Sequence, residues 1–132
     1  MSTGLKHILL GKDHVVILGR GECTDTHIVI PETINGLPVY AINSYAFAKD
    51  ELLESIEFPS TINHIGTAAF RGCPNLKAVM FAPEILFVNR GSFAECPSLT
   101  TIKLGSIKQL DWFKNECFWN SNNIEDIKIR KK

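Results

Sequence analysis

The sequence lacks several features that would assign a function directly. Its charges balance, with 14 lysine and arginine residues against 14 aspartate and glutamate residues. A nucleic-acid-binding domain usually carries a basic face, and a protein that mimics a polyanion carries an acidic one. The one run of like charge, KIRKK at 128–132, is typical of a solvated tail. We therefore expect no nucleic-acid partner.

Long hydrophobic runs are also missing. The apolar run near the N-terminus, Ile8 to Leu10, is far too short for the core of a signal peptide, and no small-residue cleavage site follows it. No segment approaches the roughly 18 apolar residues of a membrane-spanning helix. We therefore expect no membrane contact and a cytoplasmic location. A cell-surface or secreted location is the alternative if a leader has been trimmed from the chain.

Cysteine is scarce, and its spacing excludes the common cysteine motifs. There are four cysteines and no CxxC, so neither a zinc knuckle nor a redox pair is predicted. GRGE at 19–22 and GK at 11–12 both fail to complete a phosphate-binding loop. A nucleophilic Cys23 or Cys117 would need a base and an orienting group, which the sequence does not supply. We expect no catalytic residue, no cofactor and no metal.

What the sequence does contain is a repeat. Phe47, Phe70, Phe93 and Phe118 follow one another at spacings of 23, 23 and 25 residues (70 − 47, 93 − 70 and 118 − 93). When the chain is aligned on them, further positions are apolar in all four rows. These are Val39, Ile62, Ile85 and Leu110; Ile42, Ile65, Val88 and Phe113; Leu53, Leu76, Leu99 and Ile124; Ile56, Val79, Ile102 and Ile127; and Phe58, Phe81, Leu104 and Ile129.

This period predicts the architecture. Self-similarity at about 20–29 residues with L-x-x-L-x-L spacing indicates a leucine-rich-repeat solenoid with one strand in each coil. We expect a right-handed stack of about four to five coils, with short parallel strands joined by short helical or irregular turns. The whole chain, 1–132, is predicted to be one domain. Within it, 1–24 are N-terminal cap strands, 25–109 are regular repeats, and 110–132 are an irregular C-terminal repeat or cap.

An earlier, less regular coil precedes the four rows. THIVIPETINGLPVYAI places Ile28 and Ile30 in the two inward strand columns, and this coil is longer by about five residues. NGLP supplies a turn within it. Upstream, HVVILGRG is predicted to be a strand that covers the N-terminal end of the core.

The repeat resembles a known family. IVIPETINGLPVYAINSYAF and LESIEFPSTINHIGTAAFRGCPNLKAVMF resemble the BspA-like leucine-rich repeats over about residues 25–129. The chain departs from the pattern at VNRGSF in the third repeat and at FKNECFW in the fourth, which is longer by two residues. The resemblance implies a bacterial binding module rather than an enzyme, of a kind found in surface and secreted proteins.

Cys73 and Cys96 occupy one repeat position, where the other rows have Asp50 and Ser121. Stacked strands lie about 4.8 Å apart, which is compatible with a disulfide. The favoured interpretation is a small buried thiol that closes the coil against the next leucine column. Whether the two are reduced or bridged stays open.

The outward residues of the strands form what we call the strand ribbon. It comprises His27, Ser55, Ala78, Thr101 and Asp126 in one column and Val29, Glu57, Met80, Lys103 and Lys128 in the next. Its area of about 400 Å² is half of the roughly 800 Å² that each partner of a standard interface contributes. The predicted partner-binding residues are His27, Glu57, Ala78, Met80, Lys103 and Lys128, together with a second surface.

The aromatic residues of DWFKNECFWN suggest that second surface. Trp112 and Trp119 fall outside the six apolar columns, and they could cover the last coil or bind a partner. Phe87 and Trp112 share a column and are predicted to form an exposed aromatic patch. The predicted function is a non-catalytic protein-interaction module or small inhibitor or adaptor, with homodimerisation through the C-terminal coil as an option. The alternative is a fragment or short relative of a bacterial cell-surface adhesin.

Overall fold

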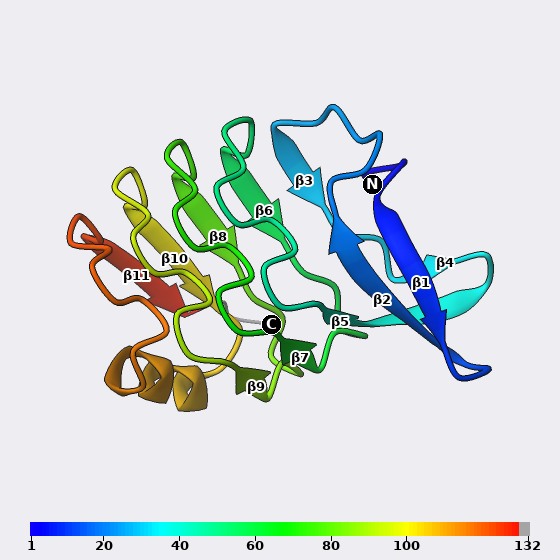
Figure 1. The fold of residues 1–132 in the computed structure, drawn as a ribbon. Coiled ribbons are helices and arrows are strands. Elements are labelled where there is room, and N and C mark those ends of the chain that lie inside the picture. The colour runs from blue at the N-terminus through cyan, green and yellow to red at the C-terminus, as the bar shows by residue number, and fades with distance from the viewer. Residues whose placement is uncertain (130–132) are drawn as a thin grey trace.

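The computed structural model describes residues 1–129, which wind into a stack of coils (Figure 1). In chain order the elements are β1 (Lys6–Leu10), β2 (His14–Gly19), β3 (His27–Val29), β4 (Thr33–Ile34), β5 (Leu37–Ile42), β6 (Ser55–Glu57), β7 (His64–Ile65), β8 (Ala78–Met80), β9 (Phe87–Val88), β10 (Thr101–Leu104), the 3-10 helix η1 (Ile107–Lys114) and β11 (Asp126–Ile129). About five turns, with parallel strands and little helix, confirm the predicted solenoid. The end of the predicted basic tail, 130–132, lies outside the described residues.

The first sheet takes one strand from each coil, in the order β11-β10-β8-β6-β3. Its strands run parallel, and Ala78 lies between Ser55 of β6 and Thr101 of β10. Thr101 in turn pairs with Asp126 of β11. The register of the sheet is therefore the one that the repeat predicts.

The second sheet forms another side of the stack, in the order β1-β2-β5-β7-β9, with β4 paired to β5. β1 and β2 form an antiparallel hairpin, and β2 pairs in parallel with β5. The strand predicted from HVVILGRG is β2, in which Val15, Val16 and Ile17 are buried. The predicted turn at NGLP joins β4 to β5, and Asn35 and Gly36 have φ of 53° and 81°, as a two-residue hairpin loop of this kind requires.

The third side of the stack consists of turns that hydrogen-bond to one another as strands do. The backbone N–H of Phe47 donates to Ala69 of the next coil, and that of Phe70 donates to Ser92, both at 2.7 Å. Two positions in each turn have positive φ and recur with the repeat. They are Tyr45, Ala68, Gly91 and Glu116 at the first position and Lys49, Gly72, Glu95 and Asn120 at the second. This backbone ladder fixes the positions of the outward side chains on the third side.

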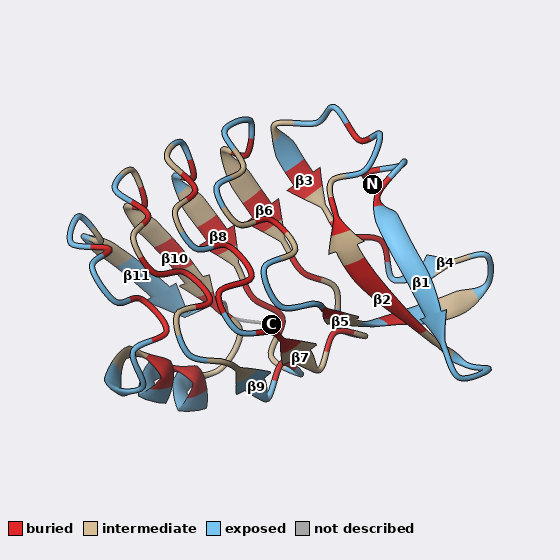
Figure 2. Cartoon of the chain, viewed as in Figure 1, coloured by how far each residue is buried: buried red, intermediate tan, exposed pale blue. Residues whose placement is uncertain are grey.

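Phenylalanine rings form a column through the core. The ring centroids of Phe47, Phe70, Phe93 and Phe118 lie 5.1, 4.9 and 5.4 Å apart, and consecutive rings are inclined by only 3°, 2° and 15°. Aromatic pairs at such distances stabilise a core beyond the area that they bury. Buried residues line the inner side of every coil (Figure 2).

The last coil departs from the predicted columns. Helix η1 follows β10 in place of the short second-sheet strand of the earlier coils, and its period of three residues turns Gln109 and Trp112 toward the core. Gln109 Nε2 donates to the carbonyl of Ala82 at 2.9 Å and so ties the helix to the preceding coil. Leu110, which was predicted to be in a core column, is exposed as a result, and Phe113 is half-buried.

Candidate functional site

The strand ribbon lies on the outer side of the first sheet. Most of its side chains are half-buried, and His27 and Lys128 are exposed. Ala78 and Met80 occupy its centre on β8, and the His27 imidazole lies 2.8 Å from Ser55 Oγ. The predicted positions are therefore confirmed, while their role in partner binding stays a prediction.

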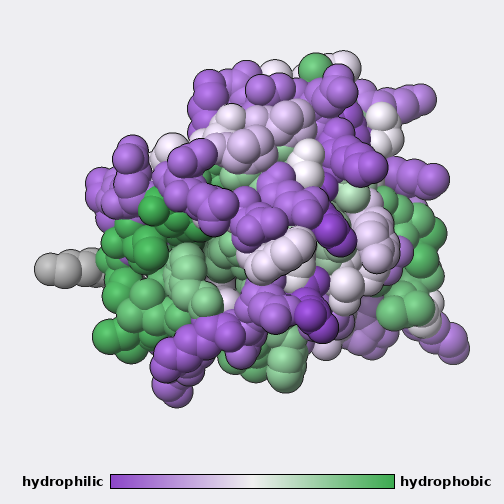
Figure 3. Space-filling model, turned by 60° about the vertical axis from the view of Figure 1, so that its left-hand side comes forward, coloured by the Kyte–Doolittle hydropathy of each residue, from purple (hydrophilic) through white to green (hydrophobic). Residues whose placement is uncertain are grey.

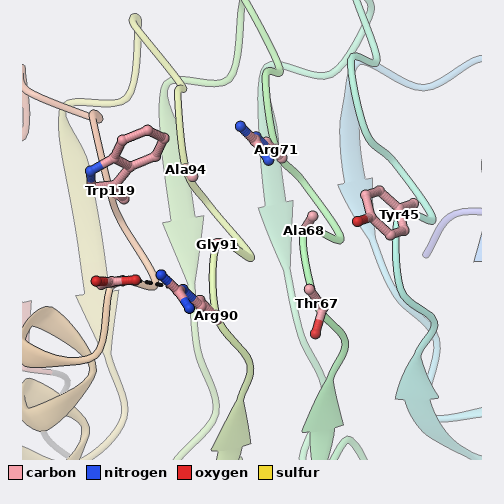
Figure 4. Close-up of a pocket in the computed structure, with 9 residues that line it drawn as sticks. Tyr45, Thr67, Ala68, Arg71, Arg90, Gly91, Ala94 and Trp119 are labelled. Atoms are coloured by element: carbon pink, nitrogen blue, oxygen red, sulfur yellow. Dashed lines mark ion pairs between the residues drawn. The ribbon is translucent and has the colours of Figure 1, made fainter.

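A groove of about 400 Å³ crosses the third side of the stack (Figure 4). Tyr45 and Trp119 stand at its two ends, and they are 62% and 51% exposed. Small residues form the floor between these aromatic rings: Ala68, Gly91 and Ala94. Thr67, Arg71, Arg90 and Glu116 complete the lining. We call this site the turn groove.

The repeat explains why a hollow forms here. At the first positive-φ position, Tyr45 is followed by Ala68 and Gly91 in the next two coils. Trp119 then projects from the last coil at the position that Ala94 occupies one coil earlier. Sequence reasoning identified Trp119 but missed Tyr45 and the arginines, because it considered the strands and treated the turns as connections. The signal was available in one aligned column, where Tyr45 and Glu116 of the outer coils flank Ala68 and Gly91.

The arginines of the turn groove form ion pairs at the surface. Nε and Nη2 of Arg71 each donate to a carboxylate oxygen of Glu95 at 3.2 Å, and Arg90 pairs with Glu116. The hydrogen bond from Arg71 lowers the pKa of Glu95 and raises that of Arg71. Both partners stay charged at neutral pH, so the groove offers donors and acceptors without a large excess of either charge.

The predicted aromatic patch of Phe87 and Trp112 does not form. Phe87 is exposed on β9, where its ring centroid lies 6.5 Å from that of His64. Trp112 is buried, and its ring centroid lies 4.7 Å from that of Phe81. The expectation that Trp112 lies on the surface was therefore wrong, because η1 turns this residue inward as part of the core. Trp119 is the tryptophan that remains on the surface.

The four cysteines are buried and free. The thiols of Cys73 and Cys96 donate to the carbonyls of Phe47 and Phe70 in the preceding coil, at 3.1 and 3.2 Å. Ser121 makes the equivalent bond from its hydroxyl at 2.6 Å. This repeat position thus carries a donor that links neighbouring coils, which confirms the predicted small buried thiol.

The chemistry of the remaining side chains is limited. Burial raises the pKa of Cys117 to about 11, so little of the nucleophilic thiolate exists at neutral pH. Within residues 1–129, no three His, Cys, Asp or Glu side chains gather closely enough to hold a metal ion. Over the same range, no helix has the length and apolar content needed to cross a membrane.

Comparison with known proteins agrees with this architecture. The family described as the BspA type leucine rich repeat region matches residues 40–132, with six copies. The chain belongs to this BspA-type family. A search of curated proteins finds no match.

Two solved structures share the fold of this BspA-type chain. A leucine-rich repeat protein from Bacteroides capillosus superposes with a TM-score of 0.77 and 19% identity, over 97% of this chain and 95% of the other. A leucine-rich cell surface protein from Faecalibacterium prausnitzii gives a TM-score of 0.68 and 19% identity, over 98% of this chain. The match covers 43% of the Faecalibacterium protein, so this chain spans less than half of its length.

Proposed function

We propose that this protein is a non-catalytic protein-interaction module and that the turn groove is its principal contact. The observation that carries the proposal is the pair of exposed aromatic residues, Tyr45 and Trp119, at the two ends of a floor of small residues. Tyrosine and tryptophan are over-represented among the residues that dominate binding energy at interfaces. The backbone ladder beneath them holds the site in shape before a partner arrives, which reduces the entropic cost of association.

The dimensions of the turn groove favour a short segment of a partner protein. A volume of about 400 Å³ lies within the range of roughly 300–1,000 Å³ that is usual for ligand sites. An apolar side chain of the segment would rest on Ala68 and Ala94 between the two aromatic rings. Polar groups of its backbone would bond to Arg71 and Arg90, whose guanidinium groups pair with carboxylates beside the groove. The strand ribbon, with Met80 at its centre, supplies the second contact surface of the proposed interaction.

The non-catalytic part of the proposal is supported by the state of the thiols. A nucleophilic cysteine needs a lowered pKa or an adjacent base, whereas burial raises the pKa of Cys117. Cys73 and Cys96 donate to backbone carbonyls and take part in coil stacking. A role in stacking explains these residues without an enzymatic function.

The test is affinity capture from an extract of the cells that make the protein, followed by mass spectrometry. Tyr45→Ala combined with Trp119→Ala should abolish capture of the partner and leave the circular dichroism spectrum unchanged. Phe87→Ala is the matched control, because it removes an aromatic residue that is 58% exposed on a different side of the stack. Equal capture by the wild-type chain and the double variant would exclude the turn groove.

A second candidate function is a small relative of bacterial cell-surface proteins. The observation that favours it is the shared fold with the Faecalibacterium cell surface protein. Protease treatment of intact cells distinguishes the two candidates, since a surface protein is digested and a cytoplasmic adaptor is protected. Digestion only after lysis would contradict the surface assignment.

A further inference from the structure

The C-terminal end of the stack presents apolar surface to solvent. β11 is the edge strand of the first sheet, and no strand within residues 1–129 pairs with its outer side. Ile127 and Ile129 continue the inward columns of the core, yet they are 44% and 42% exposed. Beside them is a hollow of about 400 Å³, lined by Phe113, Phe118, Trp119, Ile124 and Ile127 among others. Figure 3, turned so that this end comes forward, shows hydrophobic side chains gathered there.

The sequence of β11, Asp-Ile-Lys-Ile, combines this apolar surface with opposite charges. Asp126 and Lys128 project to the outer face of the sheet, while Ile127 faces inward between them. Lys128 Nζ lies 3.4 Å from Asp126 Oδ2, and both side chains are well exposed. The unpaired N–H and C=O groups of a sheet edge are a template for pairing with another strand.

We propose that a second copy of the chain closes this end, with the two β11 strands paired antiparallel about a two-fold axis at Ile127. In that register each Asp126 lies opposite the Lys128 of the other copy, because the two residues stand one position before and one position after Ile127. Ile127 lies opposite its own equivalent, on the side that continues the core. The same patch is used by both copies, as a two-fold interface requires.

Among the described residues of β11, charge favours this register over those shifted by two residues. A shift of two residues in one direction would place Lys128 opposite Lys128. The same shift in the other direction would place Asp126 opposite Asp126. Like charges directly opposite are destabilising, whereas opposite charges contribute about 0.2–1 kcal/mol for each pair. A shift by one residue would instead turn the isoleucines outward. The strand therefore specifies how two copies meet, and an unrelated apolar strand would gain neither ion pair.

The apolar surface at this end extends beyond β11 itself. The hollow lined by Phe113, Phe118 and Ile124 adds to the four residues of the strand. Trp119 is half-exposed at its margin. The interface would extend the first sheet without a break from one copy into the other, a form of strand addition.

Sedimentation of the full chain tests the proposal through charge reversal. The wild-type chain should sediment as a dimer of twice 14.7 kDa. Lys128→Asp places like charges opposite one another twice and should weaken the dimer on the order of tenfold. Combining Lys128→Asp with Asp126→Lys restores the two opposite pairs and should restore the dimer. A wild-type chain that is monomeric at high concentration, or equal association of all three proteins, would overturn the proposal.

A crosslinking measurement keeps the proposal testable if a charge variant fails to fold. Residues directly opposite in an antiparallel pair have Cα atoms about 4.5–5.5 Å apart, a distance that suits a disulfide. Ile127→Cys should therefore form a disulfide-linked dimer under mild oxidation, because residue 127 faces itself across the axis. Lys103→Cys on β10 is the control and should form no disulfide-linked dimer. Equal crosslinking of the two variants would show random collision and would reject the interface. Neither experiment changes Tyr45 or the floor of the turn groove. A negative result for the dimer is therefore distinguishable from a negative result for partner binding in the groove.

Discussion

Arg20 and Asp50 form a two-pronged ion pair that joins the N-terminal strands to the first regular coil. Nε of Arg20 lies 2.8 Å from one carboxylate oxygen of Asp50, and Nη2 lies 3.0 Å from the other. The two side chains are only 15% and 10% exposed. Asp50 also accepts hydrogen bonds from the backbone N–H groups of Leu52 and Leu53. This pair is therefore a fixed joint, unlike the more exposed ion pairs beside the turn groove.

Asp50→Ala should reduce the free energy of unfolding by about 3–5 kcal/mol, because it leaves the guanidinium of Arg20 poorly solvated and unpaired. The measurement is urea-induced unfolding followed by circular dichroism. Glu54→Ala is the control, since Glu54 pairs with Lys77 in a more exposed setting, at 36% and 64%. The control should change the free energy by less than about 1 kcal/mol. Equal effects would mean that the Arg20 pair does not join the cap to the coils.

The regular coils could be predicted from the sequence because each column recurs at a fixed period. The ion pair of Asp50 could not be predicted in this way, because its partner Arg20 lies 30 residues earlier, outside the repeat. The alignment placed Asp50 in the same column as Cys73 but gave no reason for the difference. The structure supplies the reason: Cys73 bonds to the coil before it, whereas Asp50 bonds to the N-terminal strands.

The last coil limits prediction for a different reason. Its spacing of 25 residues allowed Leu110 and Phe113 to be aligned with core positions of the earlier coils. A 3-10 helix has another side-chain period than a strand, so the inward residues became Gln109 and Trp112. The turn groove was missed because its residues lie in turns. Prediction is reliable where the backbone repeats and fails where the chain changes its secondary structure.

Leu53 and Leu52 offer a direct test of the predicted core column. Leu53 is fully buried, while its neighbour Leu52 is 52% exposed. Leu53→Ala should cost about 2–5 kcal/mol through lost burial and the cavity that remains. Leu52→Ala should change stability by no more than about 0.5 kcal/mol. Thermal and urea unfolding of both variants gives the comparison, and a cost at Leu52 as large as that at Leu53 would contradict the assigned faces.

Gly66 is required by the close approach of neighbouring coils. A Cβ atom there would lie 2.5 Å from the backbone nitrogen of Ser44, so Gly66→Ala must displace the backbone. The expected cost is about 1–3 kcal/mol or more. Gly91→Ala is the control: its φ of 69° is left-handed, but a Cβ there meets nothing closer than 3.9 Å. Ala68 already occupies the equivalent position one coil earlier, so this control should cost about 1 kcal/mol.

The irregular VNRGSF repeat places its glycine at a different position of the turn. Gly91 stands two residues before Phe93, whereas Gly66 stands four before Phe70, and Gly91 has the left-handed φ of 69°. The turn still forms, with the N–H of Ser92 donating to the carbonyl of Asn89 at 3.2 Å. A smaller loss of stability for Gly66→Ala than for Gly91→Ala would show that the stability of these turns depends on backbone conformation rather than on the close approach of the coils.

Cys117 should be unreactive in the folded protein, and its ionisation should make the protein less stable at alkaline pH. Burial raises the pKa of Cys117 from an ordinary value of 9.0 to about 11, so the folded chain holds this proton more tightly than the unfolded chain. The resulting stabilisation is present in full below pH 9 and is lost as the pH rises through about 11. Iodoacetamide at neutral pH should therefore leave Cys117 unmodified until urea unfolds the chain, as intact-mass spectrometry will report. Leu52→Cys adds an exposed thiol as the fast-reacting reference. Stoichiometric labelling of Cys117 in the native protein would contradict its burial and would point instead to a reactive nucleophile.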